Sequence, residues 1–149
     1  MGSRPRKLGR SETSHHVDYW TLAELRYSIR RFLRTREVAA RAAGIAPQQY
    51  LLLLQLKGLE GRRRTTIGVL AERLQLHHHT TVELVDRLAN EKLVTREPEG
   101  REVMVKLLPA GEALLKKLAT YSITELQTDG PALVSVLKRL IRQKNKRPG

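Results

Sequence analysis

Between Thr66 and Leu107 the spacing of apolar residues changes from a helical period to strict alternation. Two sets of positions spaced i, i+3, i+4 and i+7 predict two short helices, each with one buried face. The sets are Ile67, Leu70, Ala71 and Leu74, followed by Thr81, Leu84, Val85 and Leu88. The break between them, from Gln75 to His77, has the length that connects the two helices of a helix-turn-helix.

A two-stranded hairpin is predicted directly after the second helix. Residues 93–95 lead into the first strand, and apolar residues alternate through residues 103–108 in the second. The polar run over residues 97–102 is expected to turn the chain around Pro98 and Gly100. Two helices followed by a hairpin with a basic tip predict a winged helix-turn-helix.

Helical patterns flank this unit on both sides. From about Val17 to Ala43 the apolar spacing of 3, 4 and 3 residues predicts a helix with a seam suited to packing along another helix. The seam consists of Leu22, Leu25, Ile29 and Phe32. The next helix, Pro47 to about Lys57, is apolar on nearly every side and is expected in the middle of the fold.

Two further helices are predicted after the hairpin. The first begins near Pro109 and is expected to break at Asp129-Gly130-Pro131, and the second covers about Ala132 to Lys144. The second carries an apolar face of Leu133, Leu137 and Leu140.

The expected fold class is therefore mainly α with a small β-hairpin wing. We expect residues 1–14 to form a disordered basic arm and residues 15–149 a single domain. Within that domain, residues 47–108 are the winged helix-turn-helix, and residues 17–43 and 109–145 are the flanking helices.

The charge balance indicates an anionic partner. The chain has 28 Lys and Arg against 15 Asp and Glu, a net charge of +13, which is typical of nucleic-acid-binding domains. A cationic surface that serves only solubility is the alternative on charge alone. The absence of cysteine excludes disulfides, thiolate zinc sites and thiol redox sensing.

Several other function classes lack a signal. The chain contains no G-x-S-x-G, P-loop, G-x-G-x-x-G or HExxH motif, so we expect no enzyme activity and no cofactor. The charged start, MGSRPRKLGRSE, has no apolar core, and no run reaches 18 apolar residues. We therefore expect a cytoplasmic protein without membrane contact.

Three stretches together resemble the MarR family of bacterial transcriptional regulators. They are LAERLQLHHHTTVELVDRLANEKLVTRE, the wing EGREVMVKLL and the following PAGEALL. The resemblance covers Gly44 to about Leu118 by motif and the flanking helices by layout. It departs from the family pattern at Glu99-Gly100-Arg101, where Asp-x-Arg is usual, at Lys92, where glycine is common, and at Leu108, where threonine is usual.

The resemblance implies a homodimer whose N- and C-terminal helices interlock and whose winged helices straddle a palindromic operator. Apolar faces at both ends of the chain support this reading independently, because a lone winged helix does not need them. Packing of the two end helices on each other within one chain is the alternative, since the same spacing serves either arrangement.

Predicted DNA contacts come from the second helix, its surroundings and the wing. The first turns of a recognition helix meet base edges in the major groove, whereas Arg87 and Arg101 are expected at phosphates or the minor groove. The predicted set is Thr66, His78, His79, Thr80, Val82, Glu83, Arg87 and Arg101. Thr65 or Thr66 is also the predicted N-cap of the first helix, and Asp86 with Arg87 is alternatively a structural ion pair. The triple arginine Arg62 to Arg64 is either a phosphate contact or a solvated patch.

The run His77 to His79 also suggests a metal site. Adjacent helical residues point about 100° apart, whereas two ligands on one helix favour i, i+3 or i+4 spacing, so we expect no metal. DNA contact and simple polarity at the helix end are the remaining readings.

The resemblance further implies an effector site for a small aromatic or amphipathic molecule. Trp20, Tyr27 and Tyr50 are its candidates because the aromatic residues concentrate in the first two helices, although core packing explains aromatics equally well. The leading function is a ligand-responsive repressor that binds double-stranded DNA as a homodimer. The alternative is an architectural or non-specific nucleic-acid-binding protein.

Overall fold

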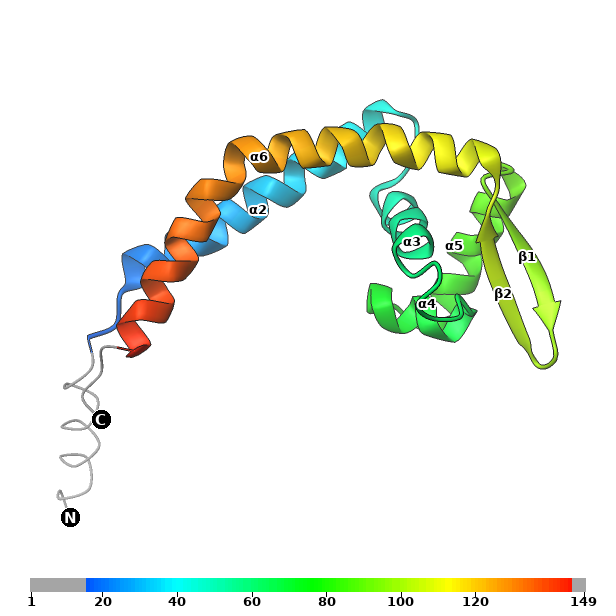
Figure 1. Cartoon of the computed structure of the whole chain (residues 1–149), viewed down its shortest axis with the longest axis horizontal. Helices are drawn as coiled ribbons and strands as arrows, with labels where there is room; N and C mark the ends of the chain where they lie inside the picture. Colours follow the sequence, from blue (N-terminus) through cyan, green and yellow to red (C-terminus); the bar gives the residue numbers. More distant parts are fainter. Residues whose placement is uncertain (1–15, 146–149) are drawn as a thin grey trace, which may run out of the picture. The chain divides into compact units, whose positions relative to one another are not determined.

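A computed structural model describes residues 16–145 of the chain, so the predicted basic arm at residues 1–14 lies outside the described residues. It contains five helices and one antiparallel hairpin within this range (Figure 1). In chain order these are α2 (Tyr19–Ala42), α3 (Pro47–Gly58), α4 (Ile67–Leu74), α5 (His78–Asn90), β1 (Val94–Glu99), β2 (Glu102–Leu107) and α6 (Pro109–Asn145). The predicted fold class, mainly α with a β-hairpin wing, is confirmed.

The chain divides into two compact units. One unit comprises residues 34–125 and holds α3, α4, α5 and the hairpin, with the end of α2 and the start of α6. The other combines residues 1–33 with residues 126–149, and its described part consists of the first turns of α2 and the last turns of α6.

Helix α3 supplies the centre of the core in the unit of residues 34–125. Leu52 and Leu53 are fully buried and Leu56 nearly so, which confirms the expected central position. The helix is not buried on every side, since Leu51 and Leu54 remain 41% and 38% exposed. Most of the remaining core side chains come from α4, α5, the hairpin and α6, among them Leu70, Val85, Leu88, Val94, Val105 and Leu115.

The hairpin forms the wing and turns more tightly than its sequence suggests. Glu99 pairs with Glu102, so only Gly100 and Arg101 make the turn, and Gly100 adopts the positive φ of 64° that favours glycine. Pro98 was expected in the turn but lies inside β1, opposite Val103. It fits there because β1 is an edge strand, where a missing N–H disrupts no ladder.

In the other unit, the beginning of α2 is tied to the end of α6. Asp18 accepts hydrogen bonds from the backbone N–H and the hydroxyl of Thr21, at 2.9 and 2.6 Å, and from the Gln143 amide at 2.6 Å. These bonds, those from Thr21 foremost, lower the pKa of Asp18 from 3.8 to about 2. Asp18 therefore caps α2 and links the two helices.

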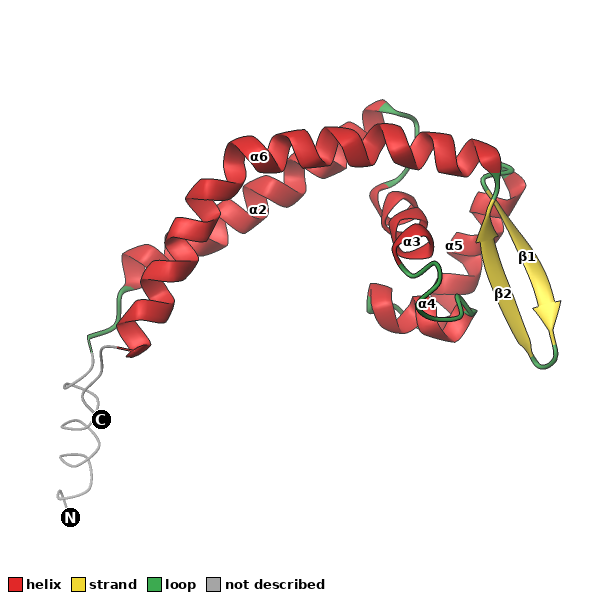
Figure 2. Cartoon of the chain, in the orientation of Figure 1, coloured by secondary structure: helices red, strands yellow, loops and turns green. Residues whose placement is uncertain are grey.

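Helix α6 runs without interruption through Pro131, so the predicted break at Asp129-Gly130-Pro131 is wrong (Figure 2). A proline inside a helix loses its hydrogen bond to the carbonyl four residues earlier, here that of Gln127. Gln127 and Pro131 are both exposed, so water can solvate the freed carbonyl. The helical turns on either side then continue the helix.

The predicted seam of α2 is only partly covered. Leu25 and Phe32 are half-buried, whereas Leu22 and Ile29 are 45% and 40% exposed. The helix therefore presents two apolar faces, one covered within its unit and one open.

Candidate nucleic-acid interface

Helix α5 has the buried and exposed faces that a recognition helix needs. Thr81, Leu84, Val85 and Leu88 are buried, as the periodicity predicted. The Thr81 hydroxyl donates to the His77 carbonyl at 3.0 Å, so this buried polar group is satisfied within the first turn. The opposite face is thereby fixed toward solvent.

That face carries polar side chains along its length. His78, His79, Glu83 and Arg87 are exposed and Thr80 is half-buried. The rings of His77 and His79 stack with centroids 5.8 Å apart and an interplanar angle of 9°. The structure thus brings five of the predicted DNA contacts together on α5.

Val82 was expected to face outward but lies half-buried against the core. Its position between the two faces of α5 lets part of the side chain pack beside its buried neighbours. The outward-facing prediction is therefore wrong in part, and no base contact is needed to explain an apolar residue here.

Asp86 anchors α5 to the wing. Its carboxylate accepts a hydrogen bond at 2.6 Å from Nη1 of Arg96, which lies on β1. The sequence suggested an ion pair between Asp86 and Arg87 as an alternative, but in the structure Asp86 pairs with Arg96. Arg87 makes no ion pair with any described residue and stays available for a ligand.

Thr66, another predicted DNA contact, serves as the N-cap of α4. Its hydroxyl accepts a hydrogen bond from the backbone N–H of Val69 at 3.2 Å, and the residue is only 6% exposed. The hydroxyl thus satisfies a free N–H of the first turn and has little surface left for DNA.

Arg101 stands at the tip of the wing. It is exposed and has no ion pair among the residues that the structure describes. The flanking carboxylates of Glu99 and Glu102 are instead bound by Arg64, and these hydrogen bonds, that of Glu99 first, raise the pKa of the Arg64 guanidinium. The wing therefore presents one free cation at its end.

The triple arginine before α4 divides into different environments. Arg64 binds the wing, Arg63 lies 3.4 Å from the carboxylate of Glu72, and Arg62 is exposed without an ion pair in the described part of the chain. Sequence reasoning treated the three as one patch and did not foresee the roles of Arg64 and Arg96. A single sequence does not distinguish an arginine that is solvated from one that forms an ion pair.

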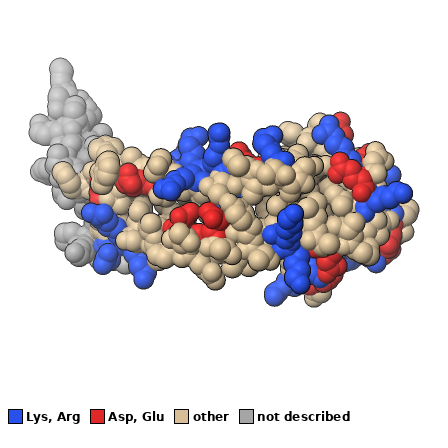
Figure 3. All heavy atoms as spheres, turned by 90° about the horizontal axis from the view of Figure 1, so that it is seen from above, with Lys and Arg blue, Asp and Glu red and all other residues tan. Residues whose placement is uncertain are grey.

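Charged residues of both signs share the surface. On the face shown in Figure 3, Lys and Arg side chains are interspersed with Asp and Glu rather than gathered on one side. Contacts to a polyanion must therefore be assigned from individual side chains, not from net charge alone.

The three effector candidates occupy different environments. Tyr50 is 7% exposed and its hydroxyl lies 3.2 Å from the Ser122 hydroxyl, which is the position of a satisfied core tyrosine. Trp20 and Tyr27 lie on α2 and are 68% and 57% exposed.

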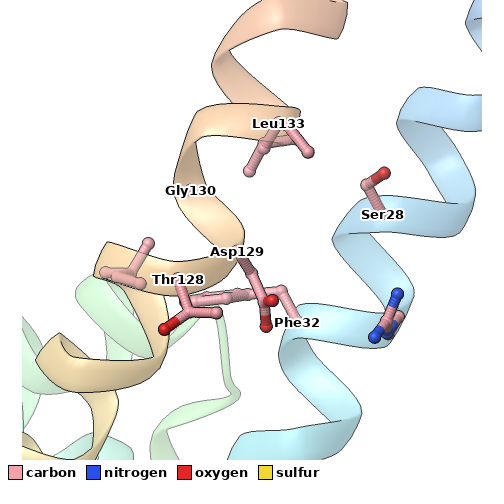
Figure 4. Close-up of a pocket in the computed structure, with 9 residues that line it drawn as sticks. Ser28, Phe32, Thr128, Asp129, Gly130 and Leu133 are labelled. Carbon is pink, nitrogen blue, oxygen red and sulfur yellow. The ribbon is translucent and has the colours of Figure 1, made fainter.

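A cavity of about 120 Å³ lies between α2 and α6 in the unit that joins the chain ends (Figure 4). Phe32 and Leu133 contribute apolar surface, and Ser28, Arg31 and Asp129 contribute polar groups. None of the three predicted aromatics lines it, and Phe32, which does, was assigned to the helix seam.

The described residues contain no group of three or more His, Asp or Glu side chains placed to hold a metal ion. None of their helices has the length and apolarity needed to cross a bilayer.

Comparison with known families confirms the resemblance seen in the sequence. Residues 43–102, which span α3, α4, α5, β1 and the wing turn, match the model of the MarR family. No curated protein sequence matches the chain.

Solved structures share the fold at low sequence identity. MepR, a transcription regulator of the Staphylococcus aureus multidrug efflux pump MepA, has a TM-score of 0.70 and 18% identity over 85% of this chain and 98% of its own. A MepR–DNA complex matches with a TM-score of 0.63 and 18% identity over the same shares of the two chains.

Two other regulators show the same likeness. AbsC from Streptomyces coelicolor has a TM-score of 0.67 and 21% identity, covering 83% of this chain and 84% of its own. BpsR from Bordetella bronchiseptica, whose DNA binding is regulated by 6-hydroxynicotinic acid, has a TM-score of 0.60 and 19% identity, covering 83% and 91%.

Proposed function

Residues 43–102 match the model of the MarR family and the chain has the fold of solved MarR-family regulators, and from this premise we propose that it represses transcription by binding a palindromic operator as a homodimer. The observation that carries the proposal is the arrangement of α5 and the wing. Helix α5 presents exposed His78, His79 and Arg87, and the wing ends in Arg101, which has no ion pair with any residue that the structure describes. Recognition of a DNA sequence requires a helix that enters the major groove and a cation that contacts the phosphate backbone or the minor groove.

The homodimer is proposed from the exposed apolar surface of the unit that joins the chain ends. In its described part no large apolar side chain is fully buried. Several remain 40–58% exposed, including Leu22, Ile29, Val134, Leu137 and Ile141. Two helices with such faces gain stability by packing against the same faces of a second copy.

Regulation by a small ligand is proposed for the cavity between α2 and α6. Its volume of about 120 Å³ approaches that which holds a single aromatic ring. Ser28 supplies a hydroxyl that can hydrogen-bond to a polar group on such a ring. Phenol, a neutral single ring with one hydroxyl, is a suitable first probe, and release of DNA on its addition would support a ligand-responsive repressor.

The test of DNA recognition is selection of bound sequences from a random duplex pool at about 150 mM salt, where non-specific attraction is partly screened. Enrichment of one inverted repeat, with half-sites about a helical turn apart, would support both dimer and operator. Absence of any enriched motif, with binding that disappears as salt rises, would overturn operator recognition and favour an architectural role.

A further inference from the structure

The segment just before α4 is fixed against the wing. Thr65 accepts a backbone hydrogen bond from Val105 at 2.9 Å and donates its hydroxyl to the Val105 carbonyl at 2.7 Å. Thr66 forms a bridge with Met104. Arg64, the preceding residue, is therefore held beside β2 by the backbone that follows it.

From this position the Arg64 side chain binds both strands near the wing tip. Nη1 donates to Glu102 at 2.5 Å, and Nη2 donates to Glu99 at 2.7 Å. These two glutamates face each other as the last pair of the hairpin. Like charges placed directly opposite destabilise a strand pair, and the guanidinium between them removes that repulsion.

The two glutamates also flank the turn that carries Arg101. Without Arg64, their carboxylates would be free to attract the Arg101 guanidinium. With Arg64 bound, both carboxylates are occupied and Arg101 has no ion pair among the described residues. The charge at the wing tip is thus set by a residue 35 positions before Glu99.

We propose that Arg64 is a positioning residue for DNA binding: together with Glu99 and Glu102 it forms a wing clamp that orders the tip and leaves Arg101 available to the DNA. This inference rests on the proposed function. All three side chains are about half exposed, and ion pairs of this kind add little to folding stability. The effect therefore belongs to binding and tip order rather than to unfolding.

A direct phosphate contact by Arg64 is the competing role. The two roles differ in what a lysine at this position would do. Lysine keeps the positive charge that a phosphate needs but lacks the planar fork that holds two carboxylates at once. Neutralising the glutamates should compensate for the loss of a clamp but not for the loss of a phosphate contact.

The experiment measures duplex affinity of the full chain and its variants, with the duplex enriched in the selection or, if none is enriched, a random duplex of about 30 base pairs. We expect Arg64→Ala and Arg64→Lys each to weaken binding about tenfold. Adding Glu99→Gln and Glu102→Gln to Arg64→Ala should restore it. The pair Arg64→Ala with Arg101→Ala should bind no more weakly than Arg101→Ala alone.

Arg63→Ala is the matched control, since its ion pair with Glu72 lies away from the wing tip and the two glutamine substitutions should not change its affinity. Full affinity in Arg64→Lys, or additive losses from Arg64 and Arg101, would assign Arg64 to a phosphate and overturn the clamp. Unchanged affinity in Arg64→Ala would overturn it as well.

Amide hydrogen exchange over residues 99–102 in the free protein separates the clamp from the proposed function. Exchange there should accelerate about tenfold in Arg64→Ala and return toward the wild-type rate when both glutamates are glutamine. Unchanged exchange would overturn the clamp. If the wild-type chain binds no duplex, the proposed function fails, and the exchange rates alone then decide whether Arg64 orders the tip.

Discussion

Lys92 occupies a backbone conformation that lysine rarely adopts. Its φ is 61°, in the left-handed region, at the point where α5 ends and the chain turns into β1. The turn is closed by hydrogen bonds from the N–H groups of Lys92 and Leu93 to the carbonyls of Ala89 and Leu88, both at 3.0 Å. A left-handed conformation at this turn is one that glycine adopts without strain.

Lys92→Gly should therefore stabilise the protein. A left-handed conformation costs a side-chain-bearing residue more than glycine, and we expect a net gain of about 1 kcal/mol in the free energy of unfolding. Urea denaturation measures it. Glu91→Gly, one residue earlier at φ −85°, has no such strain to relieve and should destabilise instead. Equal effects at both positions would contradict the argument.

Gly111 is required for a different reason, because backbone approaches it closely. A Cβ at this position would lie 2.1 Å from the Leu93 carbonyl oxygen, so Gly111→Ala would separate the start of α6 from the start of the wing. We expect a loss of about 2 kcal/mol or more in the free energy of unfolding.

Gly68→Ala, inside α4, is the control for this substitution. A Cβ there meets nothing closer than Thr66 Oγ1 at 3.9 Å, and alanine favours helix over glycine by about 1 kcal/mol. The control should therefore stabilise, and thermal unfolding of the two variants should move in opposite directions.

At the scale of elements, the cap of α2 makes part of the stability depend on pH. Because Asp18 has its pKa lowered from 3.8 to about 2, its contribution is fully present above about pH 5 and is lost as the pH falls toward 2. Thermal unfolding of the wild type and Asp18→Asn should differ at neutral pH and converge in acid. A difference that stays constant down to pH 2 would contradict the cap.

Substitutions in the recognition helix and in the wing should affect DNA binding differently. Arg101→Ala should weaken binding to all sequences and reduce the slope of log affinity against log salt by about one, as expected for one lost phosphate contact. His79→Ala should change which base is preferred, by about 1–3 kcal/mol at that position. Competition assays with variant duplexes measure both.

Lys138→Ala, an exposed cation in the unit that joins the chain ends, is the control for both substitutions and should leave affinity and preference nearly unchanged. The same loss from Lys138→Ala as from Arg101→Ala would indicate that binding follows net charge alone.

Most elements could be predicted from the sequence because apolar spacing reports local backbone period. The faces of α4 and α5 and the alternation of β2 followed that rule. The continuity of α6 through Pro131 could not be predicted in this way. A proline indicates a break locally, whereas the helical turns on both sides of it maintain the helix. The pairs Asp86–Arg96 and Arg64–Glu99 join residues 10 and 35 positions apart, and such contacts depend on where the hairpin packs.

At the scale of the whole molecule, the proposed dimer makes DNA affinity depend on residues outside the winged helix. Leu137→Glu would place a charge on a face proposed to be covered by a second copy, and burying an unpaired charge is costly. Sedimentation should show monomers, and affinity for a two-half-site duplex should fall at least about tenfold because the half-sites would then bind separately.

Ser135→Glu adds the same charge at an exposed site on the same helix and should leave the dimer intact. A wild-type chain that sediments as a monomer at micromolar concentration would contradict the proposed assembly.

The wing has one strand edge with free backbone groups, and the residues on this edge influence whether the protein aggregates by strand pairing. The outer side of β2 is occupied by Thr65 and Thr66, which leaves β1 as the strand available to another chain. Because the N–H of Val105 points away from β1 toward Thr65, its partner Arg96 and the neighbouring Pro98 turn their backbone nitrogens to the open side. Pro98 has no hydrogen to donate there, so a strand that paired with this edge would lack a hydrogen bond near the wing tip.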